Sequence, residues 1–205
     1  MATQPDAPTV EVYDEIAGTP KEPVVGLTYD DLVRMFPEDD NVRRELIGGE
    51  LIAAPLPSTR HQEIVGEIFA VLRAHAKETG GKAFVAPTGV LLATDTMVEP
   101  DVLFVRAERA DQIEDPFVRG APDLVVEVSS PSTRRLDTVR KRELYQRFGV
   151  PEYLYVDLDS ERVEIYRLVG DRYQKPIIVV RGEVVESEIL PGFSVEVAYL
   201  FGPAD

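Results

Sequence analysis

The most constraining feature of this sequence is the apolar run Leu124–Val128, which lies between Pro122 and Pro131 and contains one charged residue, Glu127. A strand this continuously apolar is typical of a central strand whose two faces are both covered. A carboxylate inside such a strand is costly unless it is paired, protonated or bound to a metal ion. The run therefore predicts the centre of a sheet and, at Glu127, a carboxylate with a specific partner.

Helical periodicity predicts a long helix before this strand. Ser58 and Thr59 are both N-cap candidates, and Gly80-Gly81 follows the expected end near Thr79. The apolar residues of this segment recur at helical spacing, so one stripe faces the core. The residues of that stripe are Ile64, Ile68, Val71, Leu72 and Ala76.

A second helix is predicted directly after the apolar strand, over about Arg134–Phe148. Ser132 is its N-cap candidate, and Gly149 marks its end. Near the N-terminus, Gly48-Gly49 is a strong signal for a two-residue hairpin. The other predicted elements are a short helix, Tyr29–Phe36, capped by Thr28, hairpin strands at 44–47 and 50–52, and strands at 82–86, 90–93, 98–105, 152–157, 162–168, 173–180 and 194–197.

This order of elements predicts a mixed α/β or α+β domain, in which a central mixed sheet is flanked by helices. Residues 1–26 contain four Pro and five acidic residues without sustained periodicity, and we expect a flexible acidic arm there. Residues 27–205 contain neither a repeat nor an internal linker. They are expected to fold as a single domain.

Composition excludes several kinds of site. The chain has no Cys, so disulfides and thiolate metal sites are impossible. Its two His residues, His61 and His75, are too few for a multi-His zinc site within one chain. No apolar run approaches the ~20 residues needed to cross a bilayer, and the N-terminus lacks the pattern of a signal peptide. We therefore expect a soluble, cytoplasmic protein.

The charge of the chain argues against broad, nonspecific binding to nucleic acid. The formal net charge is −15, whereas such binding needs a basic surface. The helix predicted over residues 134–148 is a local exception, because it carries six basic residues against two acidic ones. This basic segment is either a solvated helix face or a surface that attracts phosphate groups.

Three charged residues lie where the sequence pattern predicts apolar residues. Asp101 follows Pro100 within the strand predicted at 98–105, Glu127 lies in the apolar strand, and Lys141 lies on the helix that follows. Mg²⁺ prefers oxygen ligands, usually one or two carboxylates with water and substrate phosphate. A bound Mg²⁺ activates water, and a nearby ammonium stabilises developing negative charge. The three residues are a sufficient set for phosphodiester hydrolysis.

Each residue of this set also has a plain structural interpretation. Glu127 could form a buried ion pair with an Arg or Lys, and Lys141 could form an exposed pair with Asp137 at spacing i, i+4. Asp137, Lys141 and Tyr145 nevertheless form a row along one helix face. A row that includes an aromatic residue favours a face directed toward the sheet.

The motifs of this chain resemble the Uma-two family, a group of restriction-endonuclease-like proteins long treated as a domain of unknown function. The resemblance spans roughly Thr28–Phe201 and is most specific between Pro122 and Asp157. The matching segments are Glu45–Leu51, Ser58 with His61-Gln62, Pro100-Asp101, Pro122–Ser132, Asp137 with Lys141 and Tyr145, Gly149–Tyr153, Val156-Asp157 and Leu190–Phe193.

The resemblance implies a PD-(D/E)XK nuclease core, with a mixed sheet flanked by helices and the active site at one sheet edge. Asp101 and Glu127 would be its two acids. The Lys of the superfamily normally follows the second acid by two residues, but Ser129 stands there, and Lys141 would replace it from the next helix. Glu63 resembles the extra acid of such metal sites, or is a solvated helical Glu.

Two further positions carry alternatives. His61 would contact the substrate or support the metal ligands from outside, or would be an ordinary His near a helix cap. Asp123 also forms a Pro-Asp pair, but it precedes Glu127 on the same strand by about 13 Å at the strand rise. That separation is too large for one ion, so Asp101 is preferred. Asp137 and Tyr145 are the other candidates for residues that support the site.

The function predicted on this basis is a Mg²⁺- or Mn²⁺-dependent endonuclease that acts on DNA. Asp101 and Glu127 would hold the metal, with Glu63 as a candidate third ligand, and Lys141 would assist catalysis. By analogy with its superfamily, we expect a homodimer. The alternative is a binding or assembly protein that keeps the nuclease fold with weak or no activity. A nuclease for RNA or for a small phosphodiester also stays open.

Overall fold

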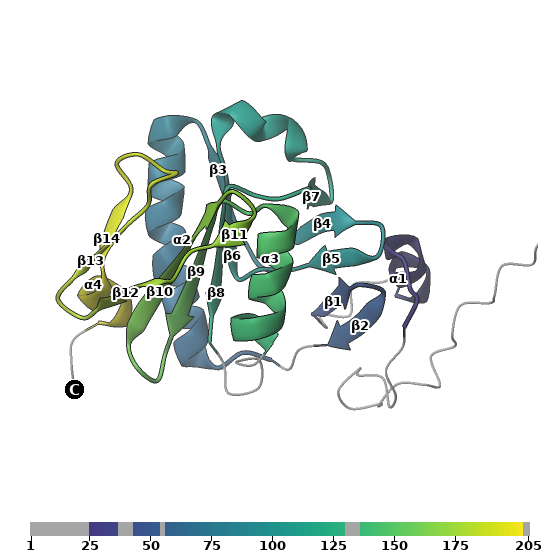
Figure 1. Cartoon of the computed structure of the whole chain (residues 1–205), viewed down its shortest axis with the longest axis horizontal. Helices are drawn as coiled ribbons and strands as arrows, with labels where there is room; N and C mark the ends of the chain where they lie inside the picture. The colour runs from purple at the N-terminus through teal and green to yellow at the C-terminus, as the bar shows by residue number, and fades with distance from the viewer. Residues whose placement is uncertain (1–24, 37–42, 54–55, 130–135, 203–205) are drawn as a thin grey trace, which may run out of the picture. The chain divides into compact units, whose positions relative to one another are not determined.

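The computed structural model describes residues 25–36, 43–53, 56–129 and 136–202 (Figure 1). The predicted arm at residues 1–26 lies, except for Val25 and Gly26, outside the described residues. The fold divides into two compact units. One comprises Met1–Leu56 with Leu91–Glu99, and the other comprises Pro57–Val90 with Pro100–Asp205.

The first unit holds a short helix and an antiparallel sheet. Helix α1 (Tyr29–Met35) begins at a capping box, in which Thr28 and Asp31 bond each other's backbone N–H groups. The predicted hairpin is confirmed, with Gly48 and Gly49 both at positive φ between strands β1 (Arg44–Ile47) and β2 (Glu50–Ala53). The strand order is β2-β1-β5-β4, where β5 is Thr96–Val98 and β4 is Gly89–Ala93, of which Leu91 onward belongs to this unit.

The second unit is built on a mixed sheet with the strand order β11-β10-β9-β8-β6-β3, and β12 also pairs with β10. The pair β8–β9 is parallel, and the pairs β10–β11, β10–β12, β9–β10, β3–β6 and β6–β8 are antiparallel. The bounds are β3 (Lys82–Val85), β6 (Val102–Val105), β8 (Leu124–Val128), β9 (Glu152–Asp157), β10 (Arg162–Val169), β11 (Arg172–Tyr173) and β12 (Ile177–Val180).

Strand β8 is central, as its composition predicts. It lies between β6 and β9, and all five of its residues are buried. Leu124, Val126 and Val128 join the apolar core with α2 (Thr59–Thr79), which is capped by Ser58 and ends at Gly80. Because side chains alternate along a strand, Glu127 lies on the opposite face, where α3 (Arg142–Phe148) packs (Figure 1).

Proline residues interrupt two of the predicted strands. The strand predicted at 98–105 is two strands, β5 and β6, and Asp101 lies in the break after Pro100. The strand predicted at 173–180 is likewise two, β11 and β12, separated around Pro176. Proline lacks the N–H that a strand ladder requires, so it separates segments that share an apolar pattern.

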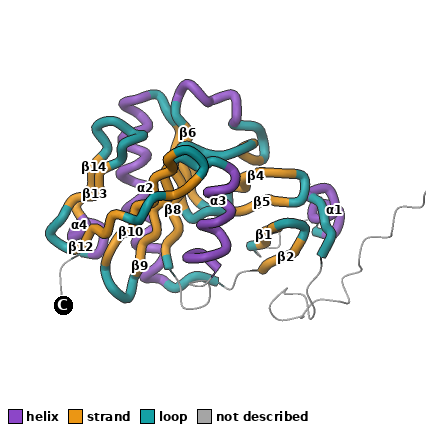
Figure 2. Tube along the Cα trace, in the orientation of Figure 1, coloured by secondary structure: helices purple, strands orange, loops and turns teal. Residues whose placement is uncertain are grey.

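The helix predicted over 134–148 differs at its beginning. Its predicted cap, Ser132, and its first residues lie outside the described residues. From Leu136 to Lys141 the backbone is a π-helix, labelled η3, which continues directly into α3, and Gly149 closes the helix in the left-handed conformation as predicted (Figure 2). A π-helical turn is frequent at functional sites.

Several short elements have no clear signal in the sequence. Residue Val197, predicted to end a strand, instead begins α4 (Val197–Phe201) after β14 (Ser194–Glu196). Each of these elements is six residues or shorter, and such lengths give too little periodicity for detection. The others are η2 (Ala107–Gln112), β7 (Phe117–Arg119) and β13 (Val184–Glu186).

Candidate active site

Glu127 is the centre of a buried polar cluster on the α3 face of the sheet. One carboxylate oxygen, Oε1, accepts a hydrogen bond from Lys141 Nζ at 3.0 Å and another from the Tyr145 hydroxyl at 2.6 Å. The three side chains are almost fully buried. Lys141 is therefore the partner that a buried carboxylate at position 127 requires. The buried ion pair and the candidate catalytic pair are the same two residues.

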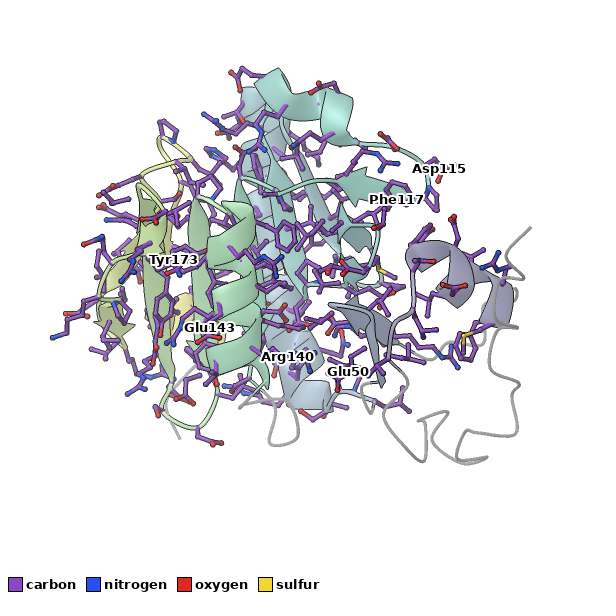
Figure 3. All side chains as sticks on the ribbon, turned by 45° about the vertical axis from the view of Figure 1, so that its right-hand side comes forward. Glu50, Asp115, Phe117, Arg140, Glu143 and Tyr173 are labelled. Atoms are coloured by element: carbon purple, nitrogen blue, oxygen red, sulfur yellow. The ribbon has the colours of Figure 1, made fainter. Side chains whose placement is uncertain are left out.

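Lys141 reaches Glu127 because of its place in the helical segment. It is the last residue of η3 and precedes α3, and its side chain is only 4% exposed. The interpretation of Lys141 as one half of an exposed surface pair is therefore wrong. Its predicted neighbour Asp137 has a side chain outside the part of the chain that the structure describes. Arg140 and Glu143, which lie on the same helical segment as Lys141, are labelled in Figure 3.

Asp101 lies at the start of β6 and is tied to the end of β8. Its Oδ2 accepts the backbone N–H of Val128 at 2.8 Å, so its carboxylate is held beside the residue that follows Glu127. The same oxygen lies 3.2 Å from Nε2 of His61. Asp101 and His61 are both buried. Pro100 thus precedes the interior strand β6, and Asp101 lies between Pro100 and the first residue of that strand. From there its side chain can turn toward β8.

His61 lies at the N-terminal cap of α2 and contacts Asp101. Its backbone N–H bonds the Oγ of Ser58 at 3.1 Å, which caps α2, and its ring contacts Asp101. The ring nitrogen Nδ1 is buried and has no hydrogen-bond partner among the described residues. The structure therefore joins the start of α2 to the carboxylate of Asp101.

Ser129 has a structural task at the position where the nuclease superfamily carries a lysine. Its hydroxyl oxygen accepts the backbone N–H of Leu158 at 2.9 Å, and its own N–H bonds the carbonyl of Val156 at 2.8 Å. These bonds join the ends of β8 and β9. Glu127 and Ser129 are two residues apart, and side chains at that spacing share one face of a strand. The Lys141 ammonium, which bonds Glu127, therefore reaches this same face from the helix.

Asp123 is a structural anion rather than part of this cluster. It is fully buried, and it accepts hydrogen bonds from the backbone N–H and Nε of Arg106 and from Nη1 of Arg109, at 2.8–2.9 Å. These contacts tie the start of β8 to the segment after β6. The choice of Asp101 over Asp123 agrees with this arrangement.

Glu63 does not share the surroundings of the other candidates. Its side chain is 62% exposed, and its Oε2 pairs with Nη1 of Arg60 at 3.0 Å. Across the described residues, no group of three or more His, Asp or Glu side chains is arranged to hold a metal ion. A site in this structure would therefore rest on two protein carboxylates, Asp101 and Glu127.

Carboxylates such as those of Asp101 and Glu127 are the kind of ligand that a hard divalent cation prefers. Mg²⁺ is commonly held by one or two carboxylates, with water and substrate oxygens in the remaining positions. Oε1 of Glu127 accepts hydrogen bonds from Lys141 and Tyr145, and Oδ2 of Asp101 accepts one from the backbone of Val128. An ionised carboxylate has about four acceptor sites, so these bonds are compatible with a metal ligand.

A tyrosine cluster packs around the helix side of the site. Tyr145 and Tyr153 have ring centroids 5.3 Å apart, and Tyr153 stacks on Tyr166 at 5.6 Å. Tyr173 completes the cluster and donates its hydroxyl to the carbonyl of Val150 at 2.9 Å. Burial raises the pKa of Tyr173 well above its usual value, so this hydroxyl stays protonated. The cluster is a rigid apolar support for Tyr145.

Residues 29–198 match the model of a protein family, Uma2, described as "Putative restriction endonuclease". The chain belongs to this family. The resemblance of the sequence motifs to Uma2 is thereby confirmed, and with it a likeness to nucleases at the level of the family. A comparison with curated proteins finds no match. Within the described residues, no helix has both the length and the apolar character needed to cross a membrane.

The Uma2 fold also matches a solved structure. The crystal structure of a "putative nuclease belonging to DUF820" from Anabaena variabilis is 20% identical in sequence and has a TM-score of 0.71. The match covers 85% of this chain and 97% of the other. At this identity the likeness concerns the fold, and it confirms the mixed α+β, restriction-endonuclease-like architecture.

Proposed function

We propose that this protein is a metal-dependent endonuclease that hydrolyses phosphodiester bonds in DNA. One observation carries the proposal: Glu127, Lys141 and Tyr145 meet in a buried cluster, and Asp101 is anchored to the residue beside Glu127. Uncompensated charge is expensive in such a place, and clusters of buried ionisable groups are typical of functional sites. Membership of the Uma2 family supports the same reaction class.

Each residue has a proposed task. Asp101 and Glu127 would hold Mg²⁺ or Mn²⁺, which supplies Lewis-acid polarisation of phosphate and activation of a bound water. Lys141 places an ammonium where negative charge develops on the phosphate. Tyr145 would orient the Glu127 carboxylate through its hydroxyl, and His61 would orient that of Asp101 through its ring nitrogen Nε2. Glu63 would enter only if its exposed side chain left Arg60, so we give it no role in the core site.

Plasmid nicking in the presence of Mg²⁺ tests the proposal. Wild-type protein should nick, and Asp101→Asn should reduce the rate by at least about a hundredfold, since it removes a charged metal ligand. Asp171→Asn is the matched control, because Asp171 is exposed in the turn between β10 and β11. Equal nicking by wild type and Asp101→Asn would show a contaminating nuclease and end the proposal.

A binding or assembly protein without nuclease activity is the second candidate. It is favoured by the net charge of −15 and by the Lys141 ammonium, which already neutralises Glu127. The two candidates differ in metal binding. A catalytic site should bind Mn²⁺ through Asp101 in calorimetric titration, whereas a scaffold that relies on Lys141 alone should not.

The proposed enzyme works as a cytoplasmic homodimer, by analogy with its superfamily. Two sites would then act on the two strands of a duplex. Light scattering coupled to size-exclusion chromatography measures the mass in solution directly. A monomer at every concentration at which nicking occurs would contradict this part of the proposal.

A further inference from the structure

A pocket lies in the second unit between α2 and the edge strand β3, away from the Glu127 cluster. Its volume is about 450 Å³. We call it the α2–β3 pocket. The side chains that matter for its chemistry are two aromatic rings, three cations and one hydroxyl: Phe69, Phe84, Arg73, Lys77, Lys82 and Thr88.

The charge of this region is opposite to that of the chain. Residues 69–88 hold Arg73, Lys77 and Lys82 against one carboxylate, Glu78, whereas the whole chain has 22 basic and 37 acidic residues. The three cations are exposed, and within the described residues none of them forms an ion pair. The helix dipole places about half a negative charge at the C-terminal end of α2, which offsets only a small part of the three positive charges. A polyanion is therefore the ligand that the pocket favours.

The aromatic residues narrow the class of polyanion. Phe69 lies one helical turn before Arg73, whose guanidinium carbon is 6.0 Å from the Phe69 ring centroid. Phe84 lines the pocket from β3, next to the core residue Ala83. A cationic groove lined by aromatic rings is the arrangement that binds single-stranded nucleic acid, because phosphates meet the cations and bases stack on the rings.

The pocket is also connected to the candidate active site. Strand β3 pairs with β6, with Val85 opposite Val102, and the next N–H, of Ala86, donates to the carbonyl of Asp101 at 3.1 Å. Thr88 therefore lines the pocket two residues beyond the residue that bonds Asp101. On the helix side, α2 begins near His61 and passes the pocket about 12 Å further on, at Phe69.

We propose that the α2–β3 pocket binds a single strand of nucleic acid that leads away from Asp101 along β3. The proposal rests on the nucleic-acid substrate proposed above and adds where the strand lies. The strand would follow the row Arg73 and Lys77, one residue per ~6 Å of helix, with at least one base on Phe69.

Fluorescence anisotropy with a labelled oligothymidylate in EDTA tests the proposal without cleavage. Arg73→Gln with Lys77→Gln should lower the magnitude of the slope of log K against log salt by about 1.4, or about 0.7 per lost phosphate contact. Arg172→Gln with Lys175→Gln is the control. It removes the same charge from exposed residues at β11 and just after it, and β11 ends the sheet opposite β3. An equal or greater loss from the control pair would overturn the proposal.

Phe69→Leu tests stacking separately, since it keeps apolar bulk and removes the ring. We expect the strand to bind roughly 5- to 150-fold more weakly. Because Phe69 also packs against the apolar core, the thermal midpoint of the variant is measured alongside, to show that it is folded at the temperature of the titration. Unchanged affinity would overturn the stacking contact. The same titrations with duplex DNA of equal length should show weaker binding and no effect of Phe69→Leu. A duplex that binds more tightly, with the same dependence on Phe69, would overturn the single-strand assignment.

The outcome is separable from that of the proposed endonuclease. If wild-type protein never nicks DNA but its strand binding depends on Arg73 and Lys77, the pocket stands and the endonuclease fails. If wild-type protein nicks and the Arg73 and Lys77 variant binds and nicks equally well, the pocket fails and the endonuclease stands.

Discussion

The buried contact between Glu127 and Lys141 is predicted to contribute to both the stability of the fold and the chemistry of the proposed site. Both side chains are buried, and their heavy atoms are 3.0 Å apart. Lys141→Ala would leave a buried carboxylate without its cation, a change that costs about 3–5 kcal/mol of unfolding free energy. Lys141→Met combined with Glu127→Gln should unfold close to wild type, because no charge is left unpaired and Tyr145 can still donate to the amide oxygen.

Urea unfolding of Lys141→Met, Glu127→Gln and their double variant measures this coupling directly. The double variant should fold and yet show no nicking activity, which separates the chemical role of the pair from its structural role. Additive losses of free energy in the double variant would show that the two side chains do not interact in solution.

Two tyrosine hydroxyls offer a matched comparison at the residue scale. Tyr145 donates to the Glu127 carboxylate, whereas Tyr173 donates to the Val150 carbonyl. Tyr145→Phe should cost about 1.5–3 kcal/mol of unfolding free energy and lower the nicking rate, because the acceptor is charged. Tyr173→Phe should cost about 1 kcal/mol without changing the rate. Equal rates for both variants would remove Tyr145 from the site.

The helix α2 and its junction with β3 set the scaffold at the scale of elements. Gly66 lies in α2 with open space around it, whereas a Cβ on Gly81 would come within 2.5 Å of the Phe104 ring. Gly66→Ala should raise the unfolding free energy by about 0.5–1 kcal/mol through helix propensity. Gly81→Ala should lower it by about 1–3 kcal/mol through overpacking. Thermal or urea unfolding of both variants measures the change in unfolding free energy, which should be positive for Gly66→Ala and negative for Gly81→Ala. Changes of the same sign would contradict the close approach at Gly81.

The capping box of α1 predicts a local pH dependence. Hydrogen bonds from the Thr28 side chain and backbone, with a contribution from Arg34, lower the pKa of Asp31 from 3.8 to about 2. Since the folded value lies below the unfolded one, the contribution of Asp31 is full above about pH 4 and is lost as the pH falls through about 2. An NMR titration of the Thr28 amide should show this midpoint. The titration midpoint should be absent in Asp31→Asn. A midpoint near pH 4 in wild type would contradict the hydrogen bonds of the Thr28–Asp31 capping box.

At the scale of the whole molecule, net charge and metal binding are linked. A chain with a net charge of −15 repels a DNA backbone, so a bound cation and a local basic pocket both improve the balance. If Asp101 and Glu127 hold a metal, that metal also stabilises the folded chain. The gain is about 2.7 kcal/mol when free Mn²⁺ is a hundred times its Kd.

Calorimetric unfolding with and without Mn²⁺ measures this linkage without any nuclease assay. We expect the thermal midpoint of wild type and of Asp171→Asn to rise with Mn²⁺ concentration. Asp101→Asn should show little change. The same rise in all three proteins would place the ion elsewhere on the acidic surface.

Patterns within a few neighbouring residues were enough to predict much of this protein. The apolar run at β8, the stripe and caps of α2 and the Gly48-Gly49 hairpin are confirmed. Each depends on alternation, helical spacing or backbone preference, which act locally. The identity of the acids Asp101 and Glu127 as site candidates could also be proposed from the sequence, since charge in apolar surroundings is visible there.

The partners of those acids were settled only by tertiary structure. The break at Pro100 turns Asp101 toward Val128, and the η3–α3 segment buries Lys141 against Glu127. Asp123 became a structural anion because Arg106 and Arg109 return to it from another part of the chain. Sequence alone therefore predicted the longer elements and showed which carboxylates lie among apolar residues. The fold decided which charges meet, because ion pairs and desolvation depend on distances between residues far apart in the chain.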